Sequence, residues 1–151
     1  MSGMSDIEQL LAIEEIKNLK ARRDRACDTK DWDLYRALHA DDHVSHNDGY
    51  ERWESADVMI ANVKALLDKG RTTVHHSHTP DITFSSPTEA RGIWGMEDYI
   101  FDSETGELMI HGFGFYHETY EKRGDKWLFT SRQLKRTHVR NKPEATSVRQ
   151  S

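Results

Sequence analysis

The sequence predicts an α+β domain in which helices pack across one face of a curved β-sheet. In the first 70 residues apolar side chains recur every three or four positions, which is typical of amphipathic helices. After Gly70 the apolar period changes to two, which indicates strands. Helices that precede a run of strands joined by turns are characteristic of α+β domains, and 151 residues fit one such domain.

Three helices are expected in the first half of the chain. They are predicted at residues 6–28, within 28–42, and at 55–70. Side chains that cap helix N-termini stand where these segments begin: Ser5 or Asp6, Asp31, and Ser55. Gly70 is expected to stop the third helix, because glycine readily adopts the left-handed conformation that ends helices.

Four β segments are expected to follow the helices, at about 72–84, 89–102, 108–122 and 126–139. The connections SSPT, SETGE and KRGDK carry turn residues, and the last two predict hairpins and therefore antiparallel pairing. Residues 1–139 are thus expected to form one domain. The polar, aperiodic tail at 140–151 is expected to be disordered.

Charge and composition argue against several function classes. The chain has 26 acidic and 21 basic residues and a net charge of −5, which disfavours nucleic-acid binding. The basic stretch KNLKARRDR is interpreted as a solvated helix face. A lone cysteine, Cys27, excludes a disulfide framework and favours a reducing compartment. With no signal-peptide pattern and no apolar span, we expect a cytoplasmic protein without membrane partners.

The stretch HGFGFYHETY predicts either a pocket or an aromatic core. Gly112 and Gly114 weaken an ordinary strand, yet they permit bending or the close approach of a ligand. Aromatic neighbours supply apolar surface for either structure: Phe113, Phe115, Tyr116 and Tyr120. The pattern does not choose between the two.

Charged residues in the predicted strands and at the end of the first helix allow two interpretations each. Strand alternation places Asp98 on one face with large apolar side chains: Trp94, Met96 and Ile100. It is either an active-site acid or a strand-end residue turned to solvent. Arg132 and Arg136 share a face and are either surface charges or cations for a ligand oxygen. Asp28, near a helix C-terminus, is either a turn residue or a carboxylate placed for chemistry.

Three histidines lie within four positions of TTVHHSHTPDITF. Histidine is the usual general base near neutral pH and the usual zinc ligand. His76 and His78 share a strand face, as a metal pair would, but two ligands do not make a site, so no metal is expected. His75 lies on the other face, and Pro80 can introduce a bulge that changes the alternation. Periodicity alone does not choose among the histidines.

The chain resembles the SnoaL-like branch of the nuclear-transport-factor-2-like superfamily over about residues 6–139. The opening helices with IEEIKNLKARRDRACDTKDWDLYRALHADD carry this resemblance. HHSHTPDIT, ARGIWGMEDY and GFYHETYEKRGDKW look most like the bacterial bile-acid dehydratases, and more distantly like scytalone dehydratase and hexachlorocyclohexane dehydrochlorinase. The resemblance implies a cone-like curved sheet, antiparallel or mixed, packed against three N-terminal helices.

The same resemblance implies roles for individual residues. His75 matches the catalytic base and Asp28 the carboxylate that orients it. Asp98 and Arg136 match further active-site residues of the bile-acid dehydratases, and Arg132 matches the arginine of the dehydrochlorinase. Apart from the resemblance, four more residues are expected to bind substrate: Trp94, Phe113, Tyr116 and His78. Arg23 stands where the dehydratases carry a tyrosine and is expected to contact substrate without donating a proton. Help for the leaving group would then come from Asp98 or Tyr116.

These positions predict a cofactor-independent lyase of dehydratase type. Its His–Asp pair would remove a proton near the carbonyl of a hydrophobic, ring-containing hydroxy-carbonyl compound. A double-bond isomerase would use the same pair, and a binding domain without turnover is the alternative from another class. Because helices cover one sheet face only, we expect a homodimer or homotrimer formed through the other face.

Overall fold

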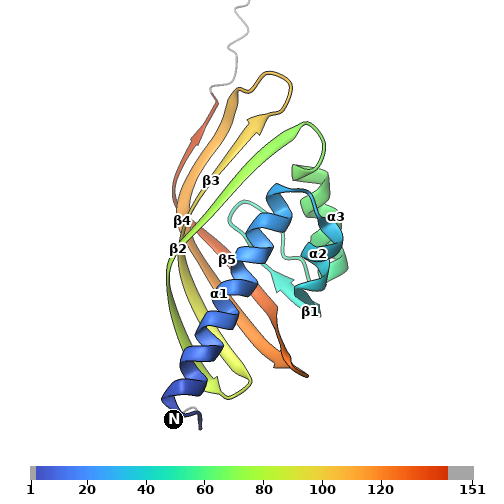
Figure 1. The fold of residues 1–151 in the computed structure, drawn as a ribbon. Helices are drawn as coiled ribbons and strands as arrows, with labels where there is room; N and C mark the ends of the chain where they lie inside the picture. The colour runs from blue at the N-terminus through green and yellow to red at the C-terminus, as the bar shows by residue number, and fades with distance from the viewer. Residues whose placement is uncertain (1–2, 143–151) are drawn as a thin grey trace, which may run out of the picture.

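The computed structural model describes residues 3–142, which form three helices and a five-stranded mixed sheet (Figure 1). Along the chain these elements are α1 (Asp6–Asp28), α2 (Trp32–Ala37), β1 (His39–Ser45), α3 (Ala56–Leu67), β2 (Arg71–Ser86), β3 (Glu89–Asp102), β4 (Leu108–Arg123) and β5 (Lys126–Asn141). The predicted α+β class is confirmed. Within the described residues no helix is both long and apolar enough to cross a membrane.

The helices begin at the predicted caps. Ser5 forms a capping box with Glu8, while Asp31 and Ser55 accept hydrogen bonds from backbone N–H groups of the first turns of α2 and α3. Such a cap stabilises a helix by about 1 kcal/mol, because it satisfies a backbone donor that has no partner within the helix. The third helix ends at Leu67, earlier than predicted, and Gly70 lies in the turn that follows with φ of 73°.

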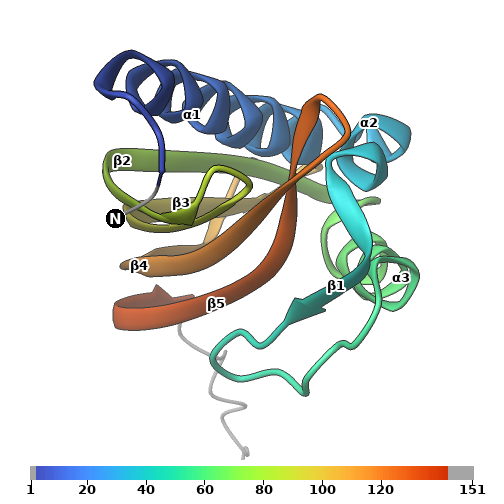
Figure 2. The ribbon, with the colours of Figure 1, turned by 90° about the horizontal axis from the view of Figure 1, so that it is seen from below.

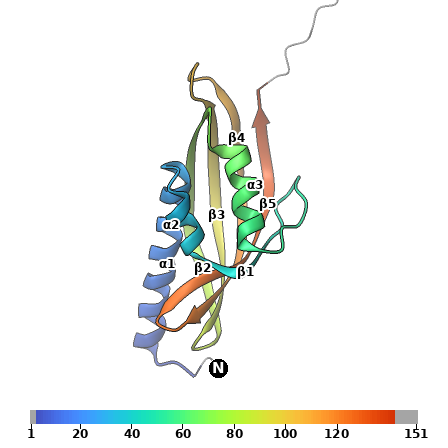
Figure 3. The same ribbon diagram turned by 90° about the vertical axis from the view of Figure 1, so that its right-hand side faces the viewer.

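The sheet has the strand order β1-β5-β4-β3-β2. Strands β2 to β5 form successive antiparallel hairpins, of which the turn residues predicted β3–β4 and β4–β5, whereas β1 pairs in parallel with β5. Figure 2 shows the sheet curving from β2 to β5, with α1 beside β2, and with α2 and α3 beside β1. Figure 3 shows α3 lying in front of the sheet, on the same face as α2.

Two predictions about the chain's organisation need correction. The segment HADDHVS was not predicted as a strand, yet it forms β1 between α2 and α3, so the strands do not all follow the helices. The last strand extends to Asn141, so the first two residues of the predicted tail belong to β5. Residues 143–151, the rest of that tail, lie outside the described residues.

A bulge in β2 decides which side chains of this strand face the helices. The β2–β3 register shifts between His78 and Asp81, and Thr79 has φ of 32°. Before the bulge Thr73, His75 and Ser77 face α1, where they contact carboxylates of that helix. After it Ile82 and Phe84 pack on the core beneath α1. The bulge at Pro80 therefore changes the alternation, as the sequence allowed.

Candidate active site

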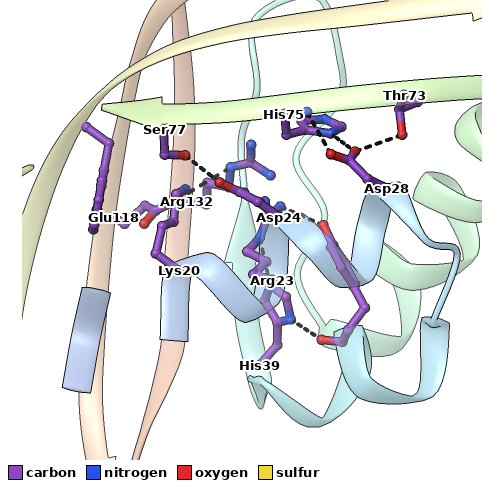
Figure 4. Close-up of polar contacts among 12 residues, drawn as sticks. Lys20, Arg23, Asp24, Asp28, His39, Thr73, His75, Ser77, Glu118 and Arg132 are labelled. Carbon is purple, nitrogen blue, oxygen red and sulfur yellow. Dashed lines mark hydrogen bonds and ion pairs between the residues drawn. The ribbon is translucent and has the colours of Figure 1, made fainter. Parts of the chain in front are cut away.

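The last turn of α1 and the edge strand β2 bring Asp28 and His75 together. His75 Nδ1 lies 2.6 Å from Asp28 Oδ1, and the backbone N–H of His75 donates to Asp28 Oδ2 at 2.8 Å. Thr73 Oγ1 donates to Asp28 Oδ1 at 2.9 Å and accepts from Lys30 Nζ at 2.9 Å. Figure 4 shows Thr73 and His75 directed from β2 toward Asp28. The carboxylate is therefore held by three donors from one strand.

This arrangement determines which ring nitrogen of His75 carries the proton. An ionised carboxylate only accepts hydrogen bonds, so Nδ1 must be protonated and Nε2 keeps its lone pair in the neutral ring. Burial alone would raise the pKa of Asp28, but the hydrogen bonds from His75 and Thr73 outweigh it and lower that pKa below its ordinary value. Within residues 3–142 Nε2 has no hydrogen-bond partner, so this nitrogen is available as a base.

Asp98 and Arg136 form a partly buried ion pair in the same region of the sheet. His75 and Asp98 are directly opposite one another in the β2–β3 ladder. Arg136 donates to both oxygens of Asp98, at 2.8 Å each, and the Asp98 side chain is 5% exposed. Because the guanidinium group of Arg136 contacts both carboxyl oxygens of Asp98, neither oxygen is free to contact a substrate.

Gly112 makes this ion pair possible. It lies on β4 directly opposite Asp98, between that residue and β5, from which the Arg136 side chain extends. A Cβ atom at this position would lie 2.0 Å from Arg136 Nη1 and 2.5 Å from Asp98 Oδ1. Because Gly112 has no side chain, the Arg136 guanidinium fits beside Asp98 at this position. The sequence had instead suggested that this glycine permits bending or the approach of a ligand.

Deeper in the domain, charged side chains replace part of the apolar core. Lys20 from α1 forms an ion pair with Glu118 of β4, and both side chains are almost completely buried. The Arg132 guanidinium lies 3.9 Å from the Tyr116 ring centroid, and Lys20 Nζ lies 4.0 Å from it on this same ring. Asp24 accepts from Ser77 Oγ at 2.6 Å. The interior is thus polar and charged around one tyrosine.

Two atoms of this network remain unsatisfied. Within the described chain, Asp24 Oδ1 and Arg132 Nε are buried without a hydrogen-bond partner. The nearest opposite charges lie beyond hydrogen-bond distance, at 3.5 Å from Arg23 Nη1 and 3.8 Å from Glu118 Oε1 respectively. Leaving such atoms unpaired costs free energy, so this part of the interior is not optimised for stability alone.

Arg23 lies on the far side of this network. Its side chain is 2% exposed, donates to the Tyr35 hydroxyl at 2.6 Å and approaches His39 Nε2 at 3.4 Å. These partners belong to α2 and β1, so the arginine joins α1 to the rest of the helical layer. Its predicted contact with substrate stays a prediction.

An open groove between α1 and β2 gives access to the His–Asp pair. It is lined by Ala21, Asp24, Arg25, Asp28, His75, His76, Ser77 and His78. His78 borders this groove, and Trp94 is buried nearby in the sheet, where its Nε1 donates to the Tyr120 hydroxyl. Phe113 lies opposite Glu97 on the outer face of the sheet, away from the His75 ring, and its predicted contact with substrate stays a prediction.

Cys27 completes a set of potential metal donors with Asp28 and His75. The thiol is 2% exposed, and burial raises its pKa to about 12. Because metals bind the thiolate, this environment disfavours a metal here. Nδ1 of the histidine is also already engaged by the carboxylate. The chemistry that this arrangement supports best is proton transfer.

Comparison with known proteins gives one family and several related structures. The SnoaL-like domain family matches residues 8–133. A protein of Gibberella zeae named "Probable cyclase FGR4" is 25% identical over 135 residues, which cover 82% of this chain and 89% of the relative.

Two solved structures illustrate the structural similarity. One is named a "Putative Scytalone Dehydratase" from Novosphingobium aromaticivorans; it has a TM-score of 0.84 and 19% identity, with 91% of this chain and 92% of that one covered. The other is a hexachlorocyclohexane dehydrochlorinase (LinA, type 2), with a TM-score of 0.81, 17% identity, and coverage of 93% and 95%. Because both identities are low, these two structures are evidence for the fold alone. The predicted resemblance to bile-acid dehydratases stays a prediction.

Proposed function

The chain belongs to the SnoaL-like family, and we propose that it is a cofactor-independent lyase of dehydratase type. One observation carries the proposal: the hydrogen bond of 2.6 Å between Asp28 Oδ1 and His75 Nδ1, which leaves Nε2 as a free base. A base oriented by a half-buried carboxylate in a groove is suited to removing a proton from carbon.

In the proposed reaction, His75 Nε2 takes a proton from carbon beside, or conjugated to, a carbonyl group. Asp28 keeps the ring in the reactive tautomer and stabilises the imidazolium that forms. Negative charge then develops on the carbonyl oxygen, where a cation such as Arg136 or Arg132 stabilises it. As the double bond forms, the carbon–oxygen bond to the hydroxyl breaks and this hydroxyl leaves with one proton, as water.

Tyr116 is the better candidate for the proton donor to the leaving group. An ordinary phenol already carries its proton at neutral pH and can donate it. Burial raises the pKa of Tyr116 well above the ordinary value, which keeps the proton in place but makes this phenol a weaker acid. Both oxygens of Asp98, in contrast, accept hydrogen bonds from Arg136. We therefore assign Asp98 the role of positioning Arg136.

The proposed substrate is a hydrophobic, ring-containing hydroxy-carbonyl compound. Support comes from the inner sheet face, where Trp94, Met96, Tyr116 and Leu134 form an apolar cluster beside the charged groups. An apolar wall with a few fixed polar groups is the usual composition of a site for such a molecule. The names of the two related structures, a dehydratase and a dehydrochlorinase, point in the same direction.

A panel of steroid, polyketide and aromatic hydroxy-ketones tests the proposal. Each compound is incubated with the wild-type protein and with His75→Gln, and products are analysed by mass spectrometry. We expect at least one compound to lose the mass of one water with the wild type only. Loss of water at equal rates with both proteins would contradict the role of His75.

A second candidate, rearrangement without a leaving group, has one observation in its favour. Arg23 replaces the tyrosine of the dehydratases, and the oxygens of Asp98 are engaged, so acid assistance is restricted. The name of the Gibberella relative refers to a cyclase. Double-bond isomerisation or ring closure would give a product of unchanged mass but altered retention time, again dependent on His75. Incubation in deuterium oxide would reveal proton abstraction in either case.

A further inference from the structure

A second cluster of histidine and carboxylate side chains lies on the outer face of the sheet. His76 on β2 and Glu97 on β3 are directly opposite one another, and His78 follows two residues later on the same face. The side chains of both histidines are 53% exposed, and that of Glu97 is 24% exposed. Successive residues of a strand point to opposite faces, so His76 and His78 project away from the His75 ring. Because β2 is the edge strand, they still border the groove that leads to His75.

The ligand atoms of this cluster are close to the spacing of one metal shell. His76 Nδ1 and His78 Nε2 each lie 3.6 Å from the same oxygen, Glu97 Oε1. All three atoms lie within 4.8 Å of one another. Tetrahedral zinc with bonds of about 2.0 to 2.1 Å separates its ligand atoms by about 3.4 Å. Small side-chain rotations of exposed histidines would therefore complete the geometry.

The other oxygen of Glu97 is held by a second layer of side chains. The Tyr99 hydroxyl donates to Oε2 at 3.1 Å, and His111 Nε2 lies 3.4 Å from it. The Tyr99 and His111 rings stack with centroids 4.0 Å apart. Such outer partners orient a ligating carboxylate and are a regular part of metal sites. The carboxylate thus presents one oxygen to the two histidines while the other is anchored.

We propose that His76, His78 and Glu97 bind a divalent transition-metal ion of the zinc type. Two imidazole nitrogens and one carboxylate oxygen suit Zn²⁺ and its first-row neighbours, whereas Mg²⁺ and Ca²⁺ prefer oxygen ligands. Three protein ligands leave the fourth tetrahedral position for water. All three ligands project from paired strands, which hold their separation.

The test is competition between the full-length, untagged, metal-stripped protein and a chromophoric zinc chelator. We expect one Zn²⁺ per chain and no displacement by Mg²⁺. His78→Gln and Glu97→Gln should each weaken zinc binding by about tenfold or more, as loss of metal-site partners typically does. Zinc should raise the unfolding temperature of the wild type, since a ligand of the folded state stabilises it.

Two matched variants control for other binding modes. His117→Gln removes a histidine on the outer face of β4, opposite Ile93 and outside the cluster, and should bind zinc like the wild type. Asp28→Asn removes a donor from the cluster at Cys27 and should also keep binding. The proposal is overturned if the wild type shows no saturable zinc binding, or if His78→Gln and Glu97→Gln bind zinc as tightly as the wild type. It is also overturned if either control variant loses as much zinc affinity as these two variants. Because zinc binding is measured directly, the result is independent of enzymatic activity.

Discussion

At the scale of single residues, the proposed chemistry depends on the coupling between Asp28 and His75. His75→Ala should lower kcat/KM by about 10²- to 10⁴-fold, the range typical of general-base catalysis. Asp28→Asn should lose a substantial part of that factor, because an amide does not hold Nδ1–H in the same way. The double variant should be little worse than His75→Ala, since residues that act as a unit lose rate non-additively.

The measurement is turnover of a compound found in the panel, or deuterium exchange at its acidic carbon. Thermal unfolding of each variant is the control, because Asp28 also binds Thr73 and the His75 backbone. Independent, multiplicative losses in folded variants would assign Asp28 another role.

A second residue-scale prediction concerns two buried histidines that stay neutral. His43 is fully buried between the Phe129 carbonyl and the Ser45 hydroxyl, and burial lowers its pKa to about 4. Burial likewise lowers the pKa of His39 well below its ordinary value. Between pH 6.5 and 4 the unfolded chain takes up protons that the folded chain does not, so acidification destabilises the fold.

For His43 alone this loss amounts to about 3 kcal/mol over that interval, at ~1.4 kcal/mol per pH unit. His43→Gln should be less stable at neutral pH. Its free energy of unfolding should fall less steeply with acidification, with a slope that corresponds to the uptake of about one proton fewer on unfolding. Urea unfolding at a series of pH values measures both quantities. A slope in His43→Gln that equals the wild-type slope would be evidence against this explanation.

At the scale of secondary-structure elements, Gly112 links strands β3, β4 and β5 through the Asp98–Arg136 pair. Gly112→Ala places a methyl group 2.0 Å from Arg136 Nη1, so the arginine must leave its partner or the strands must move. We expect a loss of about 1–3 kcal/mol in stability, typical of overpacking, together with reduced turnover.

Gly95→Ala is the matched control within the same sheet. A Cβ atom there comes no closer than 3.7 Å to its neighbours, at His78, so stability and turnover should stay near wild type. Unfolding temperature and kcat/KM are measured for both variants. Equal behaviour of the two would mean that the space at Gly112 is not needed for the ion pair.

The elements also show what the sequence could predict. In β2 to β5 apolar and polar residues alternate over long stretches between recognisable turns, so their period predicted these strands. The three N-cap residues predicted where the helices begin. Strand β1 was missed because its inward residues include His39, His43 and Ser45, polar groups that hydrogen bonds satisfy inside the fold. Polar residues at buried positions remove the apolar alternation on which strand prediction depends.

The candidate site was predictable to a different extent. Asp28 and His75 are 47 positions apart, and the family resemblance, rather than any pattern in the residues, suggested that they meet. Glu97 was not identified as the partner of His76 and His78, because the β2–β3 register that aligns them is not encoded in local periodicity. The same holds for the ion pair between Asp98 and Arg136, which spans two strand pairings.

At the scale of the whole molecule, the outer face of the sheet predicts self-association. Helices cover the inner face, while Ile93 and Phe115 on the outer face are 41% and 46% exposed. Tyr99, His111 and Phe113 extend this surface as a series of ring contacts. An apolar and aromatic sheet face of this kind is suited to packing against a second copy of the chain.

Light scattering at micromolar concentration should therefore give the mass of a dimer or trimer. Phe115→Glu should shift the protein toward the monomer, because a charge would be buried in the interface. Val58→Glu, which changes an exposed apolar residue of α3, should leave the mass unchanged. A monomeric mass for the wild type would refute the prediction.

The two faces of the sheet also predict that catalysis needs no metal. His75 faces α1, whereas the proposed zinc ligands project from the opposite face. Turnover should therefore survive exhaustive chelation, measured on metal-stripped protein with and without added zinc. If turnover disappears on chelation and returns with zinc, the outer site and the His–Asp pair are coupled.

The parallel pairing of β1 with β5 has a consequence for how the chain reaches its fold. His39 pairs with Phe129, 90 positions later, so this contact closes a long loop and contributes to slow folding. During synthesis β1 is made before its pairing strand, which follows 90 positions later. Until β5 is made, His43 lacks its hydrogen-bond partner at the Phe129 carbonyl. We therefore expect the polar groups of β1 to stay exposed in the growing chain, and exposed strand edges of this kind favour aggregation.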